Sequence, residues 1–335
     1  MQKPIESHKY NFKTKASTVI KNVDLTGKTA IVTGGYSGVG AEIVKNLSKA
    51  GAKIIVPARR VETAQKTLSN LTNVHVLEMD LMNFDSIHKF AQNVKFDKLD
   101  LLINSAGIMY VPLKRDSRGI ESHFATNHLG HFQLTMELLP LLKKSGNARV
   151  ITLSSRAQQS TPLLDDWNFE NERSYTPQIG YQQSKTANVL FSVKLDQLGK
   201  NDGIRAFAIH PGMIPTTNIG RETFNIKPWQ RNLAEKLQLI HISDFFSGLK
   251  VGFDRSKYRY LKTINQGAAT AVWAATSHDL DNLGGLYLED VNIGRLMSDD
   301  EPDNFAGGVR KHSVDLTAAD RLWKISSDLT GLDYK

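Results

Sequence analysis

The chain has 335 residues, of which 40% are hydrophobic, and this length predicts one or two domains with a large buried core. It contains no cysteine, which excludes disulfides, thiolate nucleophiles and cysteine-ligated metal sites, so any redox chemistry needs a dissociable cofactor. The net charge of +8 comes from basic residues that are dispersed along the chain, a pattern that argues against nucleic-acid binding.

Residues 1–26 are predicted to form a polar N-terminal extension, followed by a single domain over residues 27–335. The extension is rich in lysine and lacks the apolar stretch of a secretory signal. No stretch of the chain approaches the roughly 18 consecutive apolar residues that a membrane span needs. We therefore expect a cytoplasmic protein without a membrane span.

The first predicted strand, residues 28–33, leads into the glycine-rich stretch 33–40, which reads Thr-Gly-Gly-Tyr-Ser-Gly-Val-Gly and opens a helical pattern. Gly34 permits a tight turn, Gly38 lets backbone amides approach a pyrophosphate, and Gly40 allows close helix packing. The helix N-terminus adds partial positive charge. The stretch predicts a dinucleotide-binding turn, with an ordinary strand-to-helix turn as the alternative.

Short β-branched runs then alternate with longer segments of helix-like apolar spacing. The predicted strands are 28–33, 53–57, 74–79, 98–104, 148–154, 204–210 and 284–289. This alternation predicts an α/β fold, a single-domain, doubly wound parallel sheet (Rossmann-like) of about seven strands with helices on both faces. The runs at 54–56 and 101–103 are apolar at successive positions, as expected of strands buried on both faces.

Ligands of such a sheet lie beyond the carboxyl ends of its strands. Polar or glycine residues follow six predicted strands in turn: Thr33-Gly34, Ala58-Arg59-Arg60, Asp80-Leu81, Asn104-Ser105-Ala106-Gly107, Ser154-Ser155 and His210-Pro211-Gly212. We therefore expect one binding site along this edge of the sheet.

The end of the second strand indicates the cofactor. Residues 54–60 lack the acidic side chain that accepts hydrogen bonds from the adenosine ribose in NAD-binding proteins of this fold. A 2′-phosphate therefore meets no like charge there, and an arginine can hold it with a planar fork of donors. We predict NADP(H) in preference to NAD(H), with Arg59 as the main phosphate ligand and Arg60 as a helper or a solvated surface residue.

Tyr181 and Lys185 lie four residues apart and are expected on one face of a helix. A neighbouring ammonium favours the phenolate, so the sequence predicts a lowered pKa for Tyr181. The pair could then exchange a proton with a substrate hydroxyl or carbonyl. An isolated pair of this kind is usually exposed helix surface, but the polar strand ends favour a site.

Other titratable groups are assigned structural roles. His123, His128 and His131 share a predicted helical segment at about 120–142 but do not have the i, i+4 spacing of a helical zinc pair, so packing or surface roles are expected and no metal site is predicted. His210 is interpreted as a strand-end residue. The acidic residues between 165 and 172 are interpreted as a solvated loop.

The motifs resemble, in order, those of the short-chain dehydrogenase/reductase family, over about residues 28–294. They are Thr33-Gly34-x-x-x-Gly38-x-Gly40, Asp80, Asn104-x-Ala106-Gly107, Asn127, Ser155, Tyr181-x-x-x-Lys185 and Pro211-Gly212-x-x-x-Thr216. The stretches at 101–109, 126–132 and 184–191 resemble the retinol dehydrogenase and WW-domain-oxidoreductase branch. Two departures are Ser105, where asparagine is common, and an N-terminus without the membrane anchor of many retinol dehydrogenases, which weakens the case for a membrane-dissolved substrate.

The resemblance implies an alcohol/carbonyl oxidoreductase. Tyr181 would be the general acid/base, and Lys185 both its electrostatic activator and a ligand of the nicotinamide ribose. Ser155 would hydrogen-bond the substrate oxygen, and Asn127 would hold a water of the proton relay. The implied cofactor-binding residues are Gly34, Tyr36, Ser37, Gly38, Val39, Arg59, Arg60, Asp80, Leu81, Asn104, Ala106, Gly107, Tyr181, Lys185, Pro211, Gly212 and Thr216.

Two other functions stay open. One is reduction of a carbon–carbon double bond, as in the related protochlorophyllide reductases, although no cysteine is available as a proton donor. The other is a catalytically silent dinucleotide-binding interaction protein, against which the complete set of implied catalytic residues argues.

The segment at about 217–260 is rich in apolar residues, including Trp229 and Phe246. We predict that it is a mobile lid over an apolar or aromatic small molecule, with a helical hairpin packed on the core as the alternative. A homodimer is possible, and the oligomeric state stays open. The physiological substrate and the net direction of the reaction are not readable from the chain.

Overall fold

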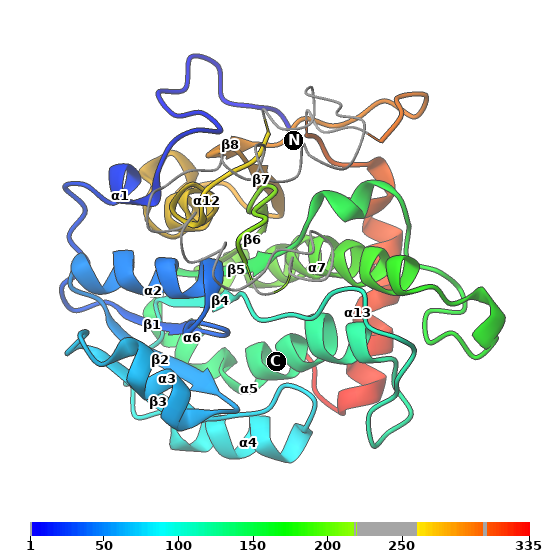
Figure 1. Ribbon diagram of the computed structural model, residues 1–335, viewed down its shortest axis with the longest axis horizontal. Helices are drawn as coiled ribbons and strands as arrows, with labels where there is room; N and C mark the ends of the chain where they lie inside the picture. Colours follow the sequence, from blue (N-terminus) through cyan, green and yellow to red (C-terminus); the bar gives the residue numbers. More distant parts are fainter. Residues whose placement is uncertain (1, 218, 220–259, 304–306) are drawn as a thin grey trace, which may run out of the picture.

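The computed structural model describes residues 2–217, 219, 260–303 and 307–335. Within these ranges one eight-stranded sheet has the order β3-β2-β1-β4-β5-β6-β7-β8 (Figure 1). The strands are β1 (Thr29–Val32), β2 (Lys53–Ala58), β3 (Val74–Glu78), β4 (Leu101–Asn104), β5 (Ala148–Leu153), β6 (Ile204–His210), β7 (Leu286–Glu289) and β8 (Asn292–Ile293). Strand order reverses between β1 and β4, the place where this fold binds ligands.

The predicted doubly wound parallel sheet is confirmed, because β1 to β7 are all parallel and each overlaps a predicted strand. The structure adds β8, which pairs antiparallel to β7. Its two residues are too few to show the alternation by which a strand is detected in a sequence. The fourth strand begins at Leu101 rather than at residue 98.

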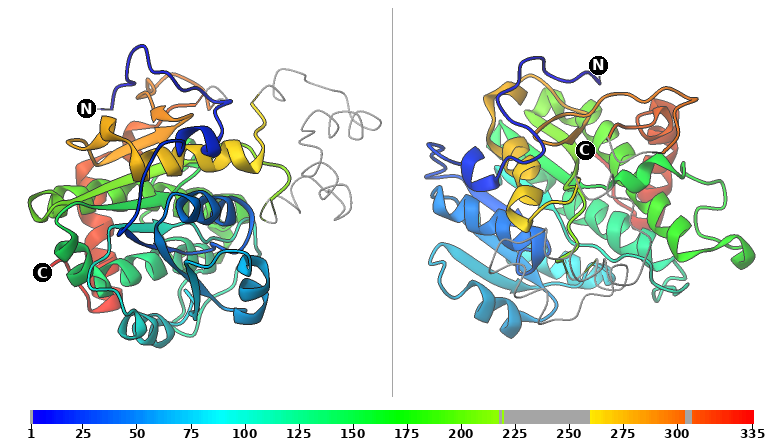
Figure 2. Two further views of the ribbon diagram at one scale, coloured as in Figure 1. Left: turned by 90° about the vertical axis from the view of Figure 1, so that its left-hand side faces the viewer. Right: turned by 45° about the horizontal axis from the view of Figure 1, so that its top comes forward.

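Helices cover both faces of the sheet (Figures 1 and 2). They are α1 (Ala16–Val19), α2 (Gly38–Lys49), α3 (Val61–Leu68), α4 (Phe84–Asn93), α5 (Gly130–Glu137), α6 (Leu139–Ser145), α7 (Pro177–Gly199), α12 (Ile264–Thr276) and α13 (Leu316–Thr330). On one face α12 packs against α1 and α2, and on the other α4 packs against α5. The helix α13, red in Figure 1, runs beside α7.

The central strands are buried on both faces, which explains their continuous apolar runs. Ile31 belongs to the hydrophobic core under α4, α5 and α7, whereas its neighbours Ala30 and Val32 belong to the core under α2 and α12. Leu102 and Ile103 divide between the two cores in the same way. Each core removes apolar side chains from water on its own side of the sheet.

The segment from about 120 to 142, which the sequence presents as one helix, is divided. A π-helix, η1 (Phe124–Leu129), comes first, then α5, and α6 begins after a turn at Leu138. Pro140 lies in the first turn of α6, where its missing N–H costs little, and it cannot continue the preceding helix.

The N-terminal segment, dark blue in Figure 2, is packed on the domain. The Gln2 side chain donates hydrogen bonds to the carbonyls of Tyr287 and Gly294, both at 2.6 Å, and accepts one from the Tyr287 amide at 3.1 Å. Ala16 and Val19 of α1 are buried. In the described ranges no helix combines the length and the apolarity that crossing a membrane would require.

The predicted lid lies almost wholly outside the described residues. Of the segment at about 217–260, only Thr217, Ile219 and Tyr260 are described, so Trp229 and Phe246 fall outside.

Candidate active site

A cavity of about 850 Å³ lies along the carboxyl edge of the sheet. Residues that follow each of β1 to β6 line it, so the polar strand ends predicted from the sequence do meet at one place. Because parallel strands all end at the same edge, residues far apart in the sequence become neighbours there.

Most of the predicted site residues line this cavity. They are Gly34, Tyr36, Ser37, Gly38, Val39, Arg59, Arg60, Asp80, Leu81, Ala106, Gly107, Ser155, Tyr181, Lys185, Pro211 and Gly212. Three predicted residues do not line it: Asn104, Asn127 and Thr216. Thr216 is 9% exposed, and the neighbouring Thr217 lines the cavity instead.

The glycine turn requires its glycines. Gly34 and Gly38 have φ of 65° and 52°, in the left-handed region that side chains with a Cβ avoid. A Cβ on Gly40 would lie 2.4 Å from the Gly34 carbonyl oxygen. Ser37, the capping residue before α2, makes no side-chain capping bond, so the first amides of the helix can donate to an anion.

The end of β1 is joined to the end of β4 through the Thr33 hydroxyl. This oxygen accepts hydrogen bonds from the amides of Ser105 at 2.8 Å and Ala106 at 3.0 Å. It lies 2.9 Å from Nε2 of the buried His131, whose Nδ1 is 3.0 Å from the Asn127 carbonyl oxygen. Burial is the main cause that lowers the pKa of His131 to about 4, so the ring is neutral and accepts from Thr33.

Arg59 and Arg60 follow β2 and are both exposed at the cavity rim. Within the described part of the chain, no carboxylate forms an ion pair with either guanidinium. Both groups can therefore meet an anionic ligand without first breaking an ion pair.

Tyr181 and Lys185 lie one turn apart on α7, which begins with Pro177 after the capping residue Thr176. Both are buried and both line the cavity. The Lys185 ammonium lies 5.6 Å from the centre of the Tyr181 ring and donates a hydrogen bond to the Leu153 carbonyl at 3.0 Å.

The prediction of a lowered Tyr181 pKa is wrong for this structure. Burial raises the pKa of Tyr181 to about 12, and the hydrogen bond with Ser155 opposes that rise only in part. Burial also lowers the pKa of Lys185 to about 8. Removing both groups from water disfavours the phenolate and the ammonium alike.

The two serines after β5 have different surroundings. The Ser154 hydroxyl is buried and donates to the Lys185 carbonyl at 2.7 Å, which ties β5 to α7. Ser155 caps the short 3₁₀-helix at Arg156–Gln159, and its side chain hydrogen-bonds Tyr181. Both serines line the cavity, and Ser155, the one predicted to bond a substrate oxygen, is the one that bonds Tyr181.

Two asparagines do not line the cavity but hydrogen-bond segments next to it. Asn127 lies in the π-helix, and its side-chain amide exchanges two hydrogen bonds with the backbone of Ile108, at 2.8 and 3.0 Å. Asn104 is 1% exposed and donates to the hydroxyls of Thr135 and Thr152. These side chains hold the loop after β4 and the end of β4 itself.

The three clustered histidines are all buried, and each makes hydrogen bonds within the protein. His128 hydrogen-bonds Ser326 of α13 at 2.7 Å, and burial is the main cause that lowers its pKa to about 3. His123 bonds Glu121 at 2.8 Å. No group of three or more metal-binding side chains occurs among the residues that the structure describes.

The pKa of His210, at the end of β6, falls to about 3, chiefly through burial.

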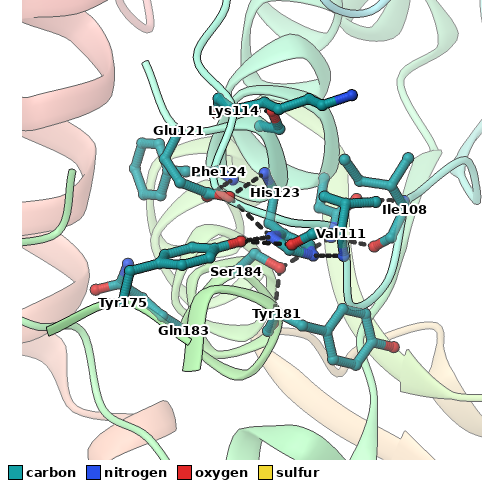
Figure 3. Close-up of polar contacts among 12 residues, drawn as sticks. Ile108, Val111, Lys114, Glu121, His123, Phe124, Tyr175, Tyr181, Gln183 and Ser184 are labelled. Atoms are coloured by element: carbon teal, nitrogen blue, oxygen red, sulfur yellow. Dashed lines mark hydrogen bonds and ion pairs between the residues drawn. The ribbon is translucent and has the colours of Figure 1, made fainter. Parts of the chain in front are cut away.

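Sequence reasoning missed three residues beside Tyr181. Tyr110 lines the cavity and its ring meets the Tyr181 ring edge-on, with centres 5.3 Å apart. Glu121 and Tyr175 form a polar cluster with His123 behind that wall, in which Glu121 and His123 are buried and Tyr175 is half-buried (Figure 3). The Tyr110–Tyr181 contact and the Tyr175–His123 bond join segments 50 or more residues apart, which no local spacing reveals, whereas Glu121 and His123 are only two residues apart.

Comparison with known proteins gives concordant results. A family model for short chain dehydrogenase matches residues 28–226. A "Probable oxidoreductase" of Streptomyces lividans is 36% identical over 314 residues, covering 91% of this chain and 98% of that one. Retinol dehydrogenase 12 of Mus musculus is 31% identical over 325 residues, covering 94% and 90%.

Solved structures resemble the chain over most of its length. The Pseudomonas aeruginosa RhlG/NADP active-site complex has a TM-score of 0.58 at 25% identity, covering 79% of this chain and 95% of that one. An uncharacterized protein from Mycobacterium Paratuberculosis has a TM-score of 0.69 at 27% identity, covering 94% and 98%.

Proposed function

The chain belongs to the short-chain dehydrogenase family, and we propose that it is an NADP(H)-dependent oxidoreductase that interconverts an alcohol and a carbonyl on an apolar or aromatic small molecule. One observation carries the proposal. Ser155, Tyr181 and Lys185 line the same cavity as the glycine turn and Arg59, so proton chemistry and dinucleotide binding share one site.

The residues present fit a dinucleotide. The positive φ angles at Gly34 and Gly38 disfavour a side chain at these two positions of the turn, and the start of α2 offers uncapped amides for a pyrophosphate. Arg59 and Arg60 would hold a 2′-phosphate, and the NADP complex among the similar structures supports this choice. The nicotinamide, when bound, supplies or accepts the hydride.

The proton is handled by this chain's own side chains. With a pKa of about 12, Tyr181 is protonated at neutral pH and can donate its proton to a carbonyl oxygen. Lys185, with a pKa of about 8, is mostly cationic there and stabilises the phenolate that remains. Ser155 donates to the same substrate oxygen. In the oxidative direction Tyr181 takes the proton back.

The proposed substrate class follows from the cavity wall near Tyr181. Ile108, Met109, Val111 and Met213 line it, and these apolar side chains favour an apolar or aromatic compound. The similarity to retinol dehydrogenases is consistent with that class.

A spectrophotometric assay of NADPH oxidation tests the proposal over a panel of aldehydes, ketones, quinones and enones. We expect turnover of aldehydes or ketones that requires Tyr181. Turnover of enones alone would replace the proposal with carbon–carbon double-bond reduction. NADPH binding without turnover of any compound would favour a silent dinucleotide-binding protein.

A further inference from the structure

The loop Ile108–Val111 forms a wall of the cavity beside Tyr181, and all four of its residues line the cavity. Tyr110 within it has a φ of 55°, in the left-handed region that a residue with a Cβ rarely occupies. Such a backbone persists only where its surroundings fix it, and such positions cluster at functional sites.

Side chains hold both ends of this loop by its backbone. At one end the Asn127 amide accepts from the Ile108 N–H at 2.8 Å and donates to the Ile108 carbonyl at 3.0 Å. At the other end the Val111 N–H donates to Nε2 of His123 at 3.3 Å, and the Tyr175 hydroxyl donates to the Val111 carbonyl at 2.7 Å. Tyr110 therefore lies between two stretches of backbone, each of which is held by two side-chain hydrogen bonds.

Glu121 determines which nitrogen of His123 carries the proton. Because Nε2 accepts from the Val111 N–H, the ring hydrogen is on Nδ1, which lies 2.8 Å from the Glu121 carboxylate (Figure 3). The carboxylate also accepts from the amides of His123 and Phe124, each at 2.8 Å, and is fully buried. Figure 3 shows the Tyr175 hydroxyl directed at the same histidine, 3.4 Å from Nδ1.

The anchors also touch the helix that carries Tyr181. Gly180 precedes Tyr181, and a Cβ there would lie 2.8 Å from the Tyr175 ring and 3.1 Å from Nδ1 of His123. The Tyr110 ring meets the Tyr181 ring edge-on at an angle of 77°. The loop and the helix are therefore fixed relative to each other through this cluster.

We propose that Tyr110 is a specificity-determining residue that selects flat, aromatic carbonyl compounds, and that Glu121, His123 and Tyr175 are positioning residues that hold it. The inference rests on the proposed function, since it takes Tyr181 as the acid/base. The faces of aromatic rings favour stacked or edge-on contact with another ring. A ring fixed beside Tyr181 thus aligns an aromatic carbonyl for proton transfer and gives a small aliphatic one no such contact.

The first test compares 2-naphthaldehyde with propanal as substrates of the wild type and of Tyr110→Leu. We expect the ratio of their kcat/KM values to fall about tenfold in the variant, with NADPH affinity unchanged. Tyr175→Phe, which removes only the hydroxyl, should lower the same ratio mainly through the KM of the aromatic substrate. In a Tyr110→Leu background it should have little further effect on that ratio, since the ring to be positioned is gone.

The second test needs no turnover. Hydrogen–deuterium exchange of a peptide containing residues 108–111 should be at least about tenfold faster in Tyr175→Phe than in the wild type, since the loop loses an anchor. Tyr334→Phe is the matched control, because it removes another bonded hydroxyl, the donor to Asp202 at 2.6 Å. It should leave exchange in this loop unchanged.

The outcomes separate the inference from the function on which it rests. If the wild type reduces aldehydes but Tyr110→Leu keeps the naphthaldehyde preference, the inference is overturned and the function stands. Exchange that is equally slow in Tyr175→Phe overturns the positioning role. A wild type that reduces no carbonyl compound overturns both.

Discussion

The ammonium of Lys185 lies 5.6 Å from the centre of the Tyr181 ring, one turn along the same helix, and both groups are buried at the cavity wall. At this separation burial dominates both pKa values, so the tyrosine stays protonated and the lysine is charged only below about pH 8. In the proposed reduction, the proton is therefore already on Tyr181, the group proposed to donate it.

Replacing Tyr181 by phenylalanine should abolish turnover while leaving NADPH affinity nearly intact. The phenyl ring keeps the packing and loses the transferable proton, and such a group contributes about a hundredfold to ten-thousandfold in rate. Steady-state kinetics and a fluorescence titration with NADPH measure the two quantities. A variant that kept most of its rate would show that another group is the acid/base.

Carbonyl reduction by the wild type should decline as the pH rises above about 8. Lys185 is cationic below its pKa of about 8 and neutral above it, so the charge that stabilises the phenolate is lost in alkaline solution. In Lys185→Arg the charge persists, and the decline should move beyond about pH 10. Lys185→Met should lower both the rate and the cofactor affinity. An unchanged alkaline limb in Lys185→Arg would exclude Lys185 as its source.

Arg59→Ala should weaken NADPH binding about tenfold to a hundredfold at low salt, since one charge-assisted phosphate contact contributes about 1.5–3 kcal/mol. NADH binding should barely change, and the loss should shrink at high ionic strength. Lys53→Ala is the control, because Lys53 is an exposed cation at the other end of β2. Equal losses for both nucleotides, or a wild type that prefers NADH, would refute the assignment.

Acid should destabilise the protein through its buried neutral histidines. The pKa of His128 is about 3 in the folded chain and about 6.5 in the unfolded chain, so between these values only the unfolded chain takes up the proton. The free energy of unfolding should fall as the pH drops below about 6.5, by about 1.4 kcal/mol per pH unit from this residue. Urea unfolding at several pH values measures how the free energy of unfolding changes with pH. In His128→Gln this change per pH unit should be smaller by that amount. The exposed His75→Gln should retain the wild-type slope.

Trp323→Ala should lower the free energy of unfolding by about 3–5 kcal/mol, the usual cost of truncating a buried large aromatic residue. Trp323 of α13 is 7% exposed. The centre of its ring lies 5.0 Å from the ring centre of Phe132 and 6.0 Å from that of Phe191. Leu316→Ala, at the 56% exposed first residue of the same helix, should cost little. Equal losses in the two variants would mean that α13 is held by something other than this aromatic contact.

The sheet and most of the cavity lining were predictable because their signals are local. The turn at Gly34–Gly40, the apolar runs and the Tyr181/Lys185 spacing each lie within a few residues of sequence, and strand order then gathers the strand ends. Features that depend on contacts distant in the sequence were not predictable. Asn127 is predicted to hold a water of the proton relay, but the two hydrogen bonds of its side-chain amide with the Ile108 backbone have no local signal in the sequence.

The pKa of Tyr181 shows a second limit of sequence reasoning. The i, i+4 spacing correctly brings Lys185 near Tyr181, but the direction of the shift depends on how deeply both are buried, which the spacing does not encode. The left-handed backbone conformation of Tyr110 could not be predicted either. A tyrosine side chain does not favour this conformation, and the hydrogen bonds that hold the neighbouring residues fix it.

The contact of α13 with α5 and α7 also affects how the chain folds during its synthesis on the ribosome. Phe132 and Phe191 leave the ribosome well before Trp323, so the nascent domain carries an aromatic surface that its own later sequence has yet to cover. Exposed surface of this kind is what chaperones bind and what drives aggregation of partly made proteins. We therefore expect a chaperone to retain a nascent chain that is arrested after α7. The same chaperone should release a chain whose α13 has already left the ribosome.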